Sequence, residues 1–409
     1  MVHPNRLILL TGLLFFLFIG IDAHAEPLIK PGDRVVFLGG TFIERMQNYG
    51  HVEAEISSRI SRVTYRNLGW SGDNVWGESR AVFGTVAQGF QRLQRDMELA
   101  RPSVIIVSYG ANEAHDGIKG LSRFVEGYQI LLNELKTHDA KIVLLTPRYY
   151  EDLGPPLPNP DTYNDQLKKY IDAIEVLAGS NNLPVVHLSK IRPTTKEIEQ
   201  RPRSWRVLPD HTGLTNNGVH FTAYGYQVLA RLIVDGLDLP SPKVTVTDGK
   251  GYNVAITNYV ATPDSVNFVM TPDRLMALQR VFARQDTVDH ANLLRIQFNN
   301  LRPGKYTISV DDVKVLRVSS NQLKTGALMP TSFCESAIKQ LYKLTEEKNV
   351  MFFHRHRPQN ETYLFLFRKH EQGNNAVEVP QFDPIIEEYE KQIRVIQNSS
   401  SYRVEIRRD

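Results

Sequence analysis

The stretch Arg34-Val35-Val36-Phe37-Leu38-Gly39-Gly40-Thr41 decides the fold, because it is an apolar run that ends in two glycines and a hydroxyl side chain. Further apolar runs lie at residues 63–67, 103–108, 141–146 and 184–188. Runs without polar alternation are typical of strands buried on both faces of a parallel sheet. We therefore expect these segments and residues 34–38 to form a parallel sheet of five strands.

Helical patterns separate these runs. They predict helices over residues 42–59, 88–100, 121–137 and 162–179, and a last helix over residues 223–236. Strands that alternate with helices form a sheet with helices on both sides, joined by right-handed crossovers. The expected fold class is therefore α/β, a three-layer α/β/α sandwich that spans residues 26–240.

The first 25 residues have the pattern of a signal peptide. His3 and Arg6 precede an apolar stretch, and Ala23-His24-Ala25 offers the small residues of a cleavage site. The apolar stretch is short for a membrane span. We expect an exported, periplasmic or secreted protein that begins near Glu26 and has no stable membrane span after cleavage.

The pattern changes after residue 242. Residues 243–325 read as short alternating strands between turn signals, which predicts a small β-sandwich-like module. Residues 326–409 are expected to form an α+β segment that packs on the α/β/α domain. Within it we expect a helix over residues 332–348, aromatic strands around residue 352 and at 363–368, a charged helix at 384–398 and a strand at 402–406.

Composition excludes several function classes. The 409 residues are 42% hydrophobic and 23% charged, so the chain has enough apolar residues for large cores. A net charge of +3 and the lack of a basic helix argue against a nucleic-acid partner. The single cysteine, Cys334, is expected to be a buried apolar residue. The sequence does not predict an oligomeric state.

Four motifs follow predicted strands or precede a helix, and so should meet at one edge of the sheet. They are Leu38-Gly39-Gly40-Thr41, Trp70-Ser71-Gly72-Asp73, Tyr109-Gly110-Ala111-Asn112-Glu113 and Asn217-Gly218-Val219-His220. In this order they resemble the four blocks of the SGNH/GDSL hydrolases, a family of esterases. The resemblance implies a flavodoxin-like fold and ester hydrolysis without a cofactor or metal. The stretch 352–363 also resembles a segment of exported bacterial members of this group.

Thr41 takes the place of the family's serine nucleophile, and Gly40 that of the aspartate beside it. A threonine hydroxyl is a competent nucleophile, but its methyl group restricts the rotamer and crowds the approach. The alternative is that Thr41 caps the helix that starts there.

Gly72 and Asn112 match the family's oxyanion donors, which stabilise the negative charge of the transition state. A glycine backbone N–H and an asparagine amide are both suited to this task. The alternative for Asn112 is a loop asparagine that bonds its own backbone.

His220 matches the family's general base, but Asn217 replaces the aspartate that orients it. An amide does not stabilise imidazolium by charge, and the same exchange in a serine protease costs about 10⁴ in rate. Asp210, Asp73 or Glu113 would be the alternative source of a carboxylate.

The sequence thus predicts an esterase that acts on small-molecule or glycan esters, with acetyl groups of glycans as the expected substrate. The alternatives are a catalytically weak or inactive carbohydrate-binding protein and an envelope interaction protein. Arg148, Tyr149 and Tyr150 follow the fourth strand and are expected near the crevice, and the loop of residues 154–160 beside them is expected to form a wall of it. The alternative is that this loop is only a stiff surface connection. His354 and His356 are expected on one face of a strand.

Overall fold

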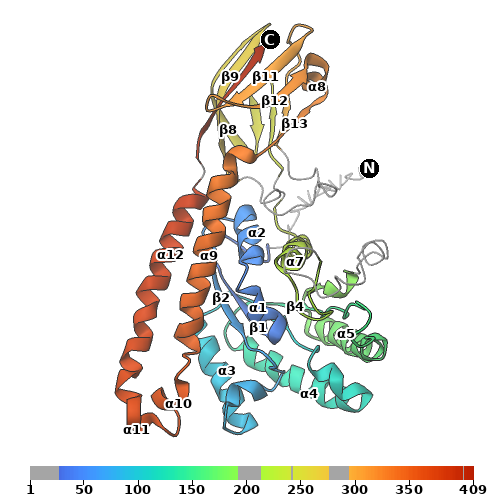
Figure 1. The fold of residues 1–409 in the computed structure, drawn as a ribbon, viewed down its shortest axis with the longest axis vertical. Coiled ribbons are helices and arrows are strands. Elements are labelled where there is room, and N and C mark those ends of the chain that lie inside the picture. Colours follow the sequence, from blue (N-terminus) through green and yellow to red (C-terminus); the bar gives the residue numbers. More distant parts are fainter. Residues whose placement is uncertain (1–26, 192–212, 241–242, 276–293, 399) are drawn as a thin grey trace, which may run out of the picture.

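The computed structural model describes residues 27–191, 213–240, 243–275, 294–398 and 400–409. Figure 1 shows three parts: an α/β domain at one end of the long axis, a β-module at the other end, and a helix pair that runs from the module along the side of the α/β domain. The expected signal peptide, residues 1–25, lies outside the described residues. No helix among the described segments has the length and apolar character needed to cross a membrane.

The α/β domain has the predicted five-stranded parallel sheet, with strand order β2-β1-β3-β4-β5. Its strands are β1 (Arg34–Gly39), β2 (Thr64–Gly69), β3 (Val104–Ser108), β4 (Lys141–Leu145) and β5 (Val185–Val186). The fifth strand is shorter than expected. The other four agree with the predicted runs within a residue or two.

Helices cover both faces of this sheet, which confirms the three-layer prediction. They are α1 (Thr41–Met46), α2 (His51–Arg59), α3 (Val86–Ala100), α4 (Gly117–Lys136), α5 (Asp161–Asn181) and α7 (Ala223–Gly236). Alternate residues of one strand serve opposite cores: Val36 packs with α3, α4 and α5, whereas Val35 packs with α1, α2 and α7. Because both faces are buried, the strands contain no polar alternation.

The single helix expected over residues 42–59 is wrong: the chain forms two helices there. Gly50 precedes α2 with a φ of 59°, a left-handed conformation that ends helical geometry and that glycine adopts without strain. Because α1 is only 6 residues long, it is a short turn that presents Thr41 and Glu44.

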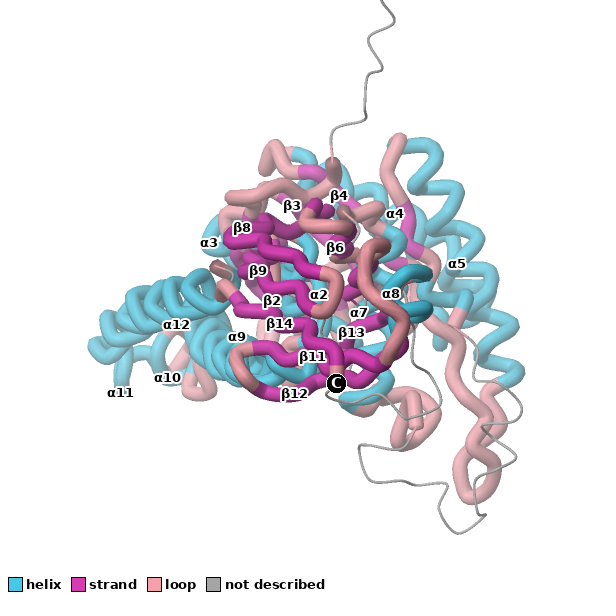
Figure 2. Tube along the Cα trace, turned by 90° about the horizontal axis from the view of Figure 1, so that it is seen from above, coloured by secondary structure: helices cyan, strands magenta, loops and turns pink. Residues whose placement is uncertain are grey.

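The β-module consists of two sheets, one of order β13-β10-β6-β7 and the other of order β12-β11-β14-β9-β8. Its strands are β6 (Thr245–Thr247), β7 (Lys250–Tyr252), β8 (Val254–Thr262), β9 (Ser265–Pro272), β10 (Leu294–Gln297), β11 (Lys305–Val310), β12 (Val313–Ser319), β13 (Ala327–Met329) and β14 (Tyr402–Arg408), with the helix α8 (Ser320–Thr325). Strand β14 pairs with β9 and β11, so the end of the chain completes the module. Figure 2, seen from the module end, shows these strands above the α/β domain.

The segment between β13 and β14 is helical. It contains α9 (Glu335–His356), α10 (Glu361–Leu364), α11 (Lys369–Gln372) and α12 (Phe382–Gln397). The aromatic strands expected around residue 352 and at 363–368 are therefore wrong, as is the placement of His354 and His356 on a strand. Phe352 instead packs on the α/β domain from one face of α9, where its ring joins that domain's core. Aromatic residues favour strands in general, but burial on a helix face outweighs that preference.

The α9–α12 pair is fixed to the α/β domain by buried ion pairs. Lys348 on α9 donates to Glu53 on α2 at 2.6 Å, and Arg66 on β2 pairs with Glu390 on α12. All four residues are buried. Cys334, directly before α9, is buried as expected and donates from Sγ to the Tyr402 hydroxyl oxygen at 3.4 Å.

Candidate active site

The four motifs meet at the carboxyl ends of the strands, around a cavity of about 240 Å³. Thr41 from the first motif, Asn112 from the third and His220 from the fourth line this cavity. Gly72 and Asn217 are not lining residues of this cavity, but they bond Thr41 and His220 directly. All five residues that the sequence singled out are therefore part of one site.

Thr41 is the first residue of α1, and Gly40 is its N-cap. The Thr41 side chain makes no capping hydrogen bond, so the alternative interpretation of Thr41 as a helix cap is wrong. Its Oγ1 instead accepts a hydrogen bond from the backbone N–H of Gly72 at 3.0 Å. The hydroxyl proton of Thr41 is not used in this bond and remains available to a base.

The turn that delivers Thr41 requires glycine at position 39. A Cβ there would lie 2.4 Å from the backbone oxygen of Ser108 on β3, far inside a van der Waals contact. This close approach explains why an apolar strand ends in glycine at the point where the site begins.

The oxyanion loop, residues 70–73, is held by side chains from other elements. Gly72 has a φ of +74°, which suits glycine and turns its N–H toward Thr41. The Asn112 amide donates from Nδ2 to the Gly72 carbonyl oxygen at 2.8 Å. Asn112 therefore does not bond its own backbone, which rules out the alternative considered for it. Two candidate donors lie next to the candidate nucleophile.

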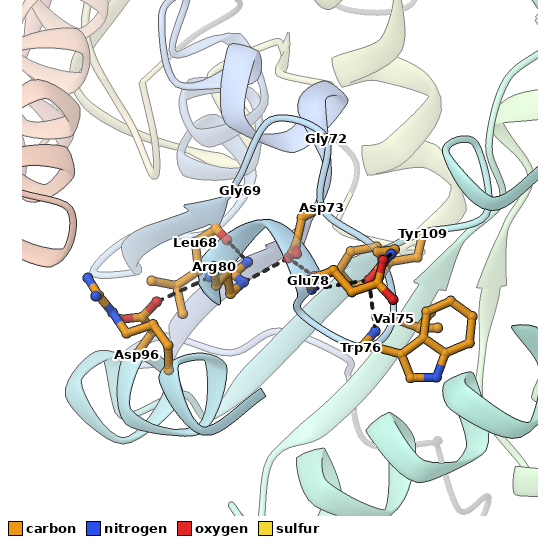
Figure 3. A network of polar contacts seen from close by, with 12 residues as sticks. Leu68, Gly69, Gly72, Asp73, Val75, Trp76, Glu78, Arg80, Asp96 and Tyr109 are labelled. Atoms are coloured by element: carbon orange, nitrogen blue, oxygen red, sulfur yellow. Dashed lines mark hydrogen bonds and ion pairs between the residues drawn. The ribbon is translucent and has the colours of Figure 1, made fainter. Parts of the chain in front are cut away.

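Asp73, the last residue of this loop, is held by hydrogen bonds from two buried side chains. Its Oδ2 accepts hydrogen bonds from Arg80 Nε at 2.7 Å and from the Tyr109 hydroxyl at 2.9 Å. Arg80 is fully buried, and it also donates to Asp96 and to the backbone oxygen of Leu68. Figure 3 shows this network below the loop that carries Gly72 and Asp73.

His220 is paired with Asn217, as the motif predicts. Asn217 Nδ2 lies 3.0 Å from His220 Nδ1, and Asn217 Oδ1 accepts the backbone N–H groups of His220 at 2.8 Å and of Val219 at 3.1 Å. These two backbone bonds fix which end of the amide faces the ring. Since Nδ2 is a donor only, Nδ1 must accept, and the proton of the neutral ring is then on Nε2.

Neither of the described alternative acids orients His220. Asp73 is held by Arg80 and Tyr109, and Glu113 accepts the backbone N–H groups of Gly110 at 2.8 Å and Val75 at 3.0 Å. Burial raises the pKa of Glu113 to about 7. Asp210 lies outside the described residues.

Arg45 is a site residue that the sequence reasoning missed. It lines the cavity, and its positive charge, after the larger effect of burial, lowers the pKa of His220 below the usual value of 6.5. Arg45 follows Thr41 by four residues, so the helical spacing puts both on one face of α1. That spacing was the available signal.

Arg148 and Tyr150 line the cavity as expected, whereas Tyr149 and the loop of residues 154–160 are not among its lining residues. The Arg148 guanidinium lies 4.3 Å from the centre of the Phe221 ring and donates to the Gly218 carbonyl oxygen at 3.1 Å. It thereby ties the end of β4 to the turn before His220. Among the described residues no group of three His, Cys, Asp or Glu side chains is placed to hold a metal ion.

Residues 32–228 match the model of the GDSL-like Lipase/Acylhydrolase family. The chain belongs to this family. Membership of this family implies esterase or acylhydrolase activity. A search of curated proteins found no match.

Among solved structures, the fold resembles that of BT4096, a gut microbial diltiazem-metabolizing enzyme, with a TM-score of 0.70 and 13% identity over 93% of this chain and 98% of that chain. The likeness therefore extends beyond the family domain into the β-module and the helix pair. A catalytic mutant of Axe2, an acetylxylan esterase from Geobacillus stearothermophilus, is 18% identical over 52% of this chain and 97% of its own, with a TM-score of 0.37. These likenesses concern the fold alone.

Proposed function

We propose that this GDSL-family protein is an exported esterase that removes O-acyl groups, chiefly acetyl groups, from glycans, with Thr41 as nucleophile and His220 as base. The observation that carries the proposal is the 3.0 Å hydrogen bond from the Gly72 N–H to Thr41 Oγ1 at a cavity that His220 also lines. A hydroxyl beside an oxyanion donor, with an imidazole in the same cavity, is the arrangement that acyl transfer requires.

The proposed reaction has two halves. His220 Nε2 takes the Thr41 hydroxyl proton while Oγ1 bonds the ester carbonyl carbon, and the Gly72 N–H and the Asn112 amide stabilise the negative carbonyl oxygen. The carbon–oxygen bond to the alcohol then breaks, and the alcohol takes the proton from His220. Water repeats the sequence on the acyl-Thr41 ester, and its attack restores the hydroxyl and releases the acid.

The hydrogen bond from Asn217 makes this reaction slow. With Nδ2 donating to Nδ1, the neutral ring carries its proton on Nε2, which is the nitrogen that must accept the Thr41 proton. Catalysis requires either the minor tautomer or a rotated amide. The protein therefore combines a hydroxyl and oxyanion donors at one cavity with a base that is rarely in its active form.

The cavity supports a short acyl group and a sugar alcohol. Its volume of about 240 Å³ is at the small end for ligand sites, which favours acetyl over long chains. Tyr150, which is half-buried, supplies an aromatic wall of the kind that stacks on sugar rings. The apolar segment and small residues before residue 26 support export to a compartment where glycans are exposed.

An acyl-length series tests this proposal. The purified protein that begins at Glu26 is incubated with 4-nitrophenyl acetate, butyrate and octanoate, and with an O-acetylated xylooligosaccharide. We expect slow acetate release that is faster than release of the longer acids, and deacetylation of the oligosaccharide. A rate equal to the buffer rate for every ester would contradict the proposal.

The Asn217 geometry favours one second function, a glycan-binding protein without turnover. In that case the O-acetylated oligosaccharide binds, as measured by calorimetry, and no acetate is released over hours. Binding together with acetate release supports the esterase.

A further inference from the structure

Arg357, at the end of α9 in the helix pair, contacts the oxyanion loop. Arg357 follows His356 and is the C-cap of the helix. Its Nη1 donates to Glu44 Oε2 at 2.9 Å, and Glu44 belongs to α1, three residues after Thr41. Residues that are 313 positions apart in the sequence are thus paired beside the nucleophile.

Glu44 passes this contact to the loop. The same Oε2 atom accepts the backbone N–H of Ser71, the residue directly before the Gly72 donor. One carboxylate oxygen therefore joins the Arg357 guanidinium to the backbone of the oxyanion loop. Hydrogen bonds between charged groups and a backbone N–H are stronger than neutral ones and so fix its direction.

Arg357 also stacks on Trp70, the residue before Ser71. The guanidinium carbon lies 3.9 Å from the centre of the Trp70 ring, which is within the range of a cation–π contact. Trp70 is buried. Arg357 thus contacts the first residue of the loop directly and the second through Glu44.

A second arginine, Arg92, binds the helix pair from the α/β domain. Arg92 on α3 donates to the backbone oxygen of His356 and pairs with Glu361 on α10. Its guanidinium lies 5.7 Å from the Trp70 ring. The end of α9 is therefore held at the loop from the domain side, which leaves Arg357 little freedom to move away.

The two ends of the loop are held by different parts of the chain. Asp73 at one end is bound by Arg80 and Tyr109 of the α/β domain, whereas Trp70 and Ser71 at the other end are bound by Arg357 and Glu44. Gly72 lies between them. We infer that Arg357 is a positioning residue that, through Glu44, aims the Gly72 N–H at the developing oxyanion, so that the C-terminal helix pair is part of the esterase site. This inference rests on the proposed function.

Removal of Arg357 should loosen the end of the loop that carries Trp70 and Ser71. Without Arg357, the Glu44 carboxylate would have no charged partner among the described side chains and would turn toward solvent. The Ser71 N–H would lose its acceptor, and this end of the loop would keep only the backbone bond from Trp70 to Gly39 and the contacts of the Trp70 ring with Arg80 and Arg92. Small displacements of a catalytic donor reduce rates steeply, by as much as about 10² for about 1 Å.

The test compares three variants of the full mature chain. Arg357→Ala removes both contacts, and Arg357→Lys keeps a cation near Glu44 but loses the planar stack. Arg355→Ala is the matched control, because Arg355 also lies near the end of α9 and pairs with an acid, but its partner Asp383 belongs to the helix pair itself, at 2.9 Å.

We expect Arg357→Ala to lower kcat for 4-nitrophenyl acetate about tenfold with KM changed less than about twofold, since a transition-state donor is displaced. Arg357→Lys should recover part of kcat, and Arg355→Ala should match the wild type. Equal kcat in Arg357→Ala and the wild type would overturn the inference. An equal loss in Arg355→Ala would also overturn it, because the effect would then come from damage to the helix pair.

Amide hydrogen exchange gives a readout that does not need activity. In the wild type the Ser71 and Gly72 amides are bonded and should exchange slowly. We expect both to exchange about tenfold faster in Arg357→Ala and at the wild-type rate in Arg355→Ala. Unchanged exchange overturns the positioning role. Faster exchange in a protein without esterase activity refutes the proposed function but leaves the positioning role standing.

Discussion

The two halves of the site differ in how their polar groups are arranged. On the nucleophile side, Thr41, Gly72 and Asn112 form a chain of hydrogen bonds that aims a backbone donor at a hydroxyl. On the base side, the Asn217 amide holds His220 in the tautomer whose proton is on Nε2. One half has the arrangement needed to stabilise an oxyanion, while the other half resists taking the proton that creates it.

This difference teaches that fold and oxyanion geometry do not set the rate by themselves. The buried Asp73–Arg80–Tyr109 network keeps the donor side rigid whether or not the base is competent. A carboxylate at position 217 would accept from Nδ1 and free Nε2, as the family pattern provides. The tautomer of His220, and with it the expected rate, therefore depends on whether residue 217 carries an amide or a carboxylate.

The largest effect is expected for the nucleophile. Thr41→Ala removes Oγ1 and keeps the fold, because Thr41 makes no capping bond. We expect hydrolysis of 4-nitrophenyl acetate to fall to the buffer rate, with the melting temperature little changed. Residual turnover in this variant at the wild-type level would assign the activity to another site.

Asn217→Asp should raise the rate on the order of 10², and at most about 10⁴, since it supplies the charge and the tautomer that the base requires. The carboxylate can keep both backbone bonds that Oδ1 now accepts. The measurement is kcat at pH 8 beside the wild type, with the double variant Thr41→Ala/Asn217→Asp as control. A rate no higher than that of the wild type would mean that the amide is not what limits the base.

Thr41→Ser keeps the hydroxyl and removes the methyl group, so the nucleophile gains rotamer freedom. We expect kcat to rise on the order of tenfold, which corresponds to ~1.4 kcal/mol in the barrier. The serine variant is compared with the wild type on the acetate ester. A slower serine variant would show that the methyl group helps to hold Oγ1 near the Gly72 N–H.

The smallest effect is expected from pH. Burial, and then Arg45, lower the pKa of His220 below 6.5, so the neutral base persists into mildly acidic solution and activity falls only as pH drops through that lowered pKa. Arg45→Gln removes a positive charge, so the acid limb of the kcat/KM profile should move to higher pH, by less than about one unit. A shift to lower pH, or none, would show that Arg45 does not act on His220.

The α/β domain could be predicted from the sequence because its strands are continuous apolar runs and its motifs follow their ends. The same rule placed Thr41, Gly72, Asn112 and His220 at one edge. Arg45 was missed because it belongs to none of the four motifs, although its spacing of four residues from Thr41 places both on one face of α1. The direction of the Asn217 amide is set by the backbone N–H groups of Val219 and His220. The sequence does not show which way these groups point, so it did not predict which end of the amide faces the ring.

The C-terminal region was harder to predict. Aromatic and basic residues around Phe352 suggested strands, but the ring is buried against the α/β domain and the segment is helical. Its partners, such as Glu44 for Arg357, lie some 300 positions away, and a pattern read along the chain does not show them. Tertiary contacts of this kind outweigh local preference.

The position of the proton on His220 tests the contrast between the two halves most directly. ¹⁵N NMR of histidine-labelled protein at pH 8, assigned with a His220→Gln variant, distinguishes a protonated ring nitrogen from a bare one. We expect Nε2 of His220 to carry the proton in the wild type and Nδ1 to carry it in Asn217→Asp. A wild-type ring with its proton on Nδ1 would contradict this, because the base would then be ready and Asn217 would not restrain it.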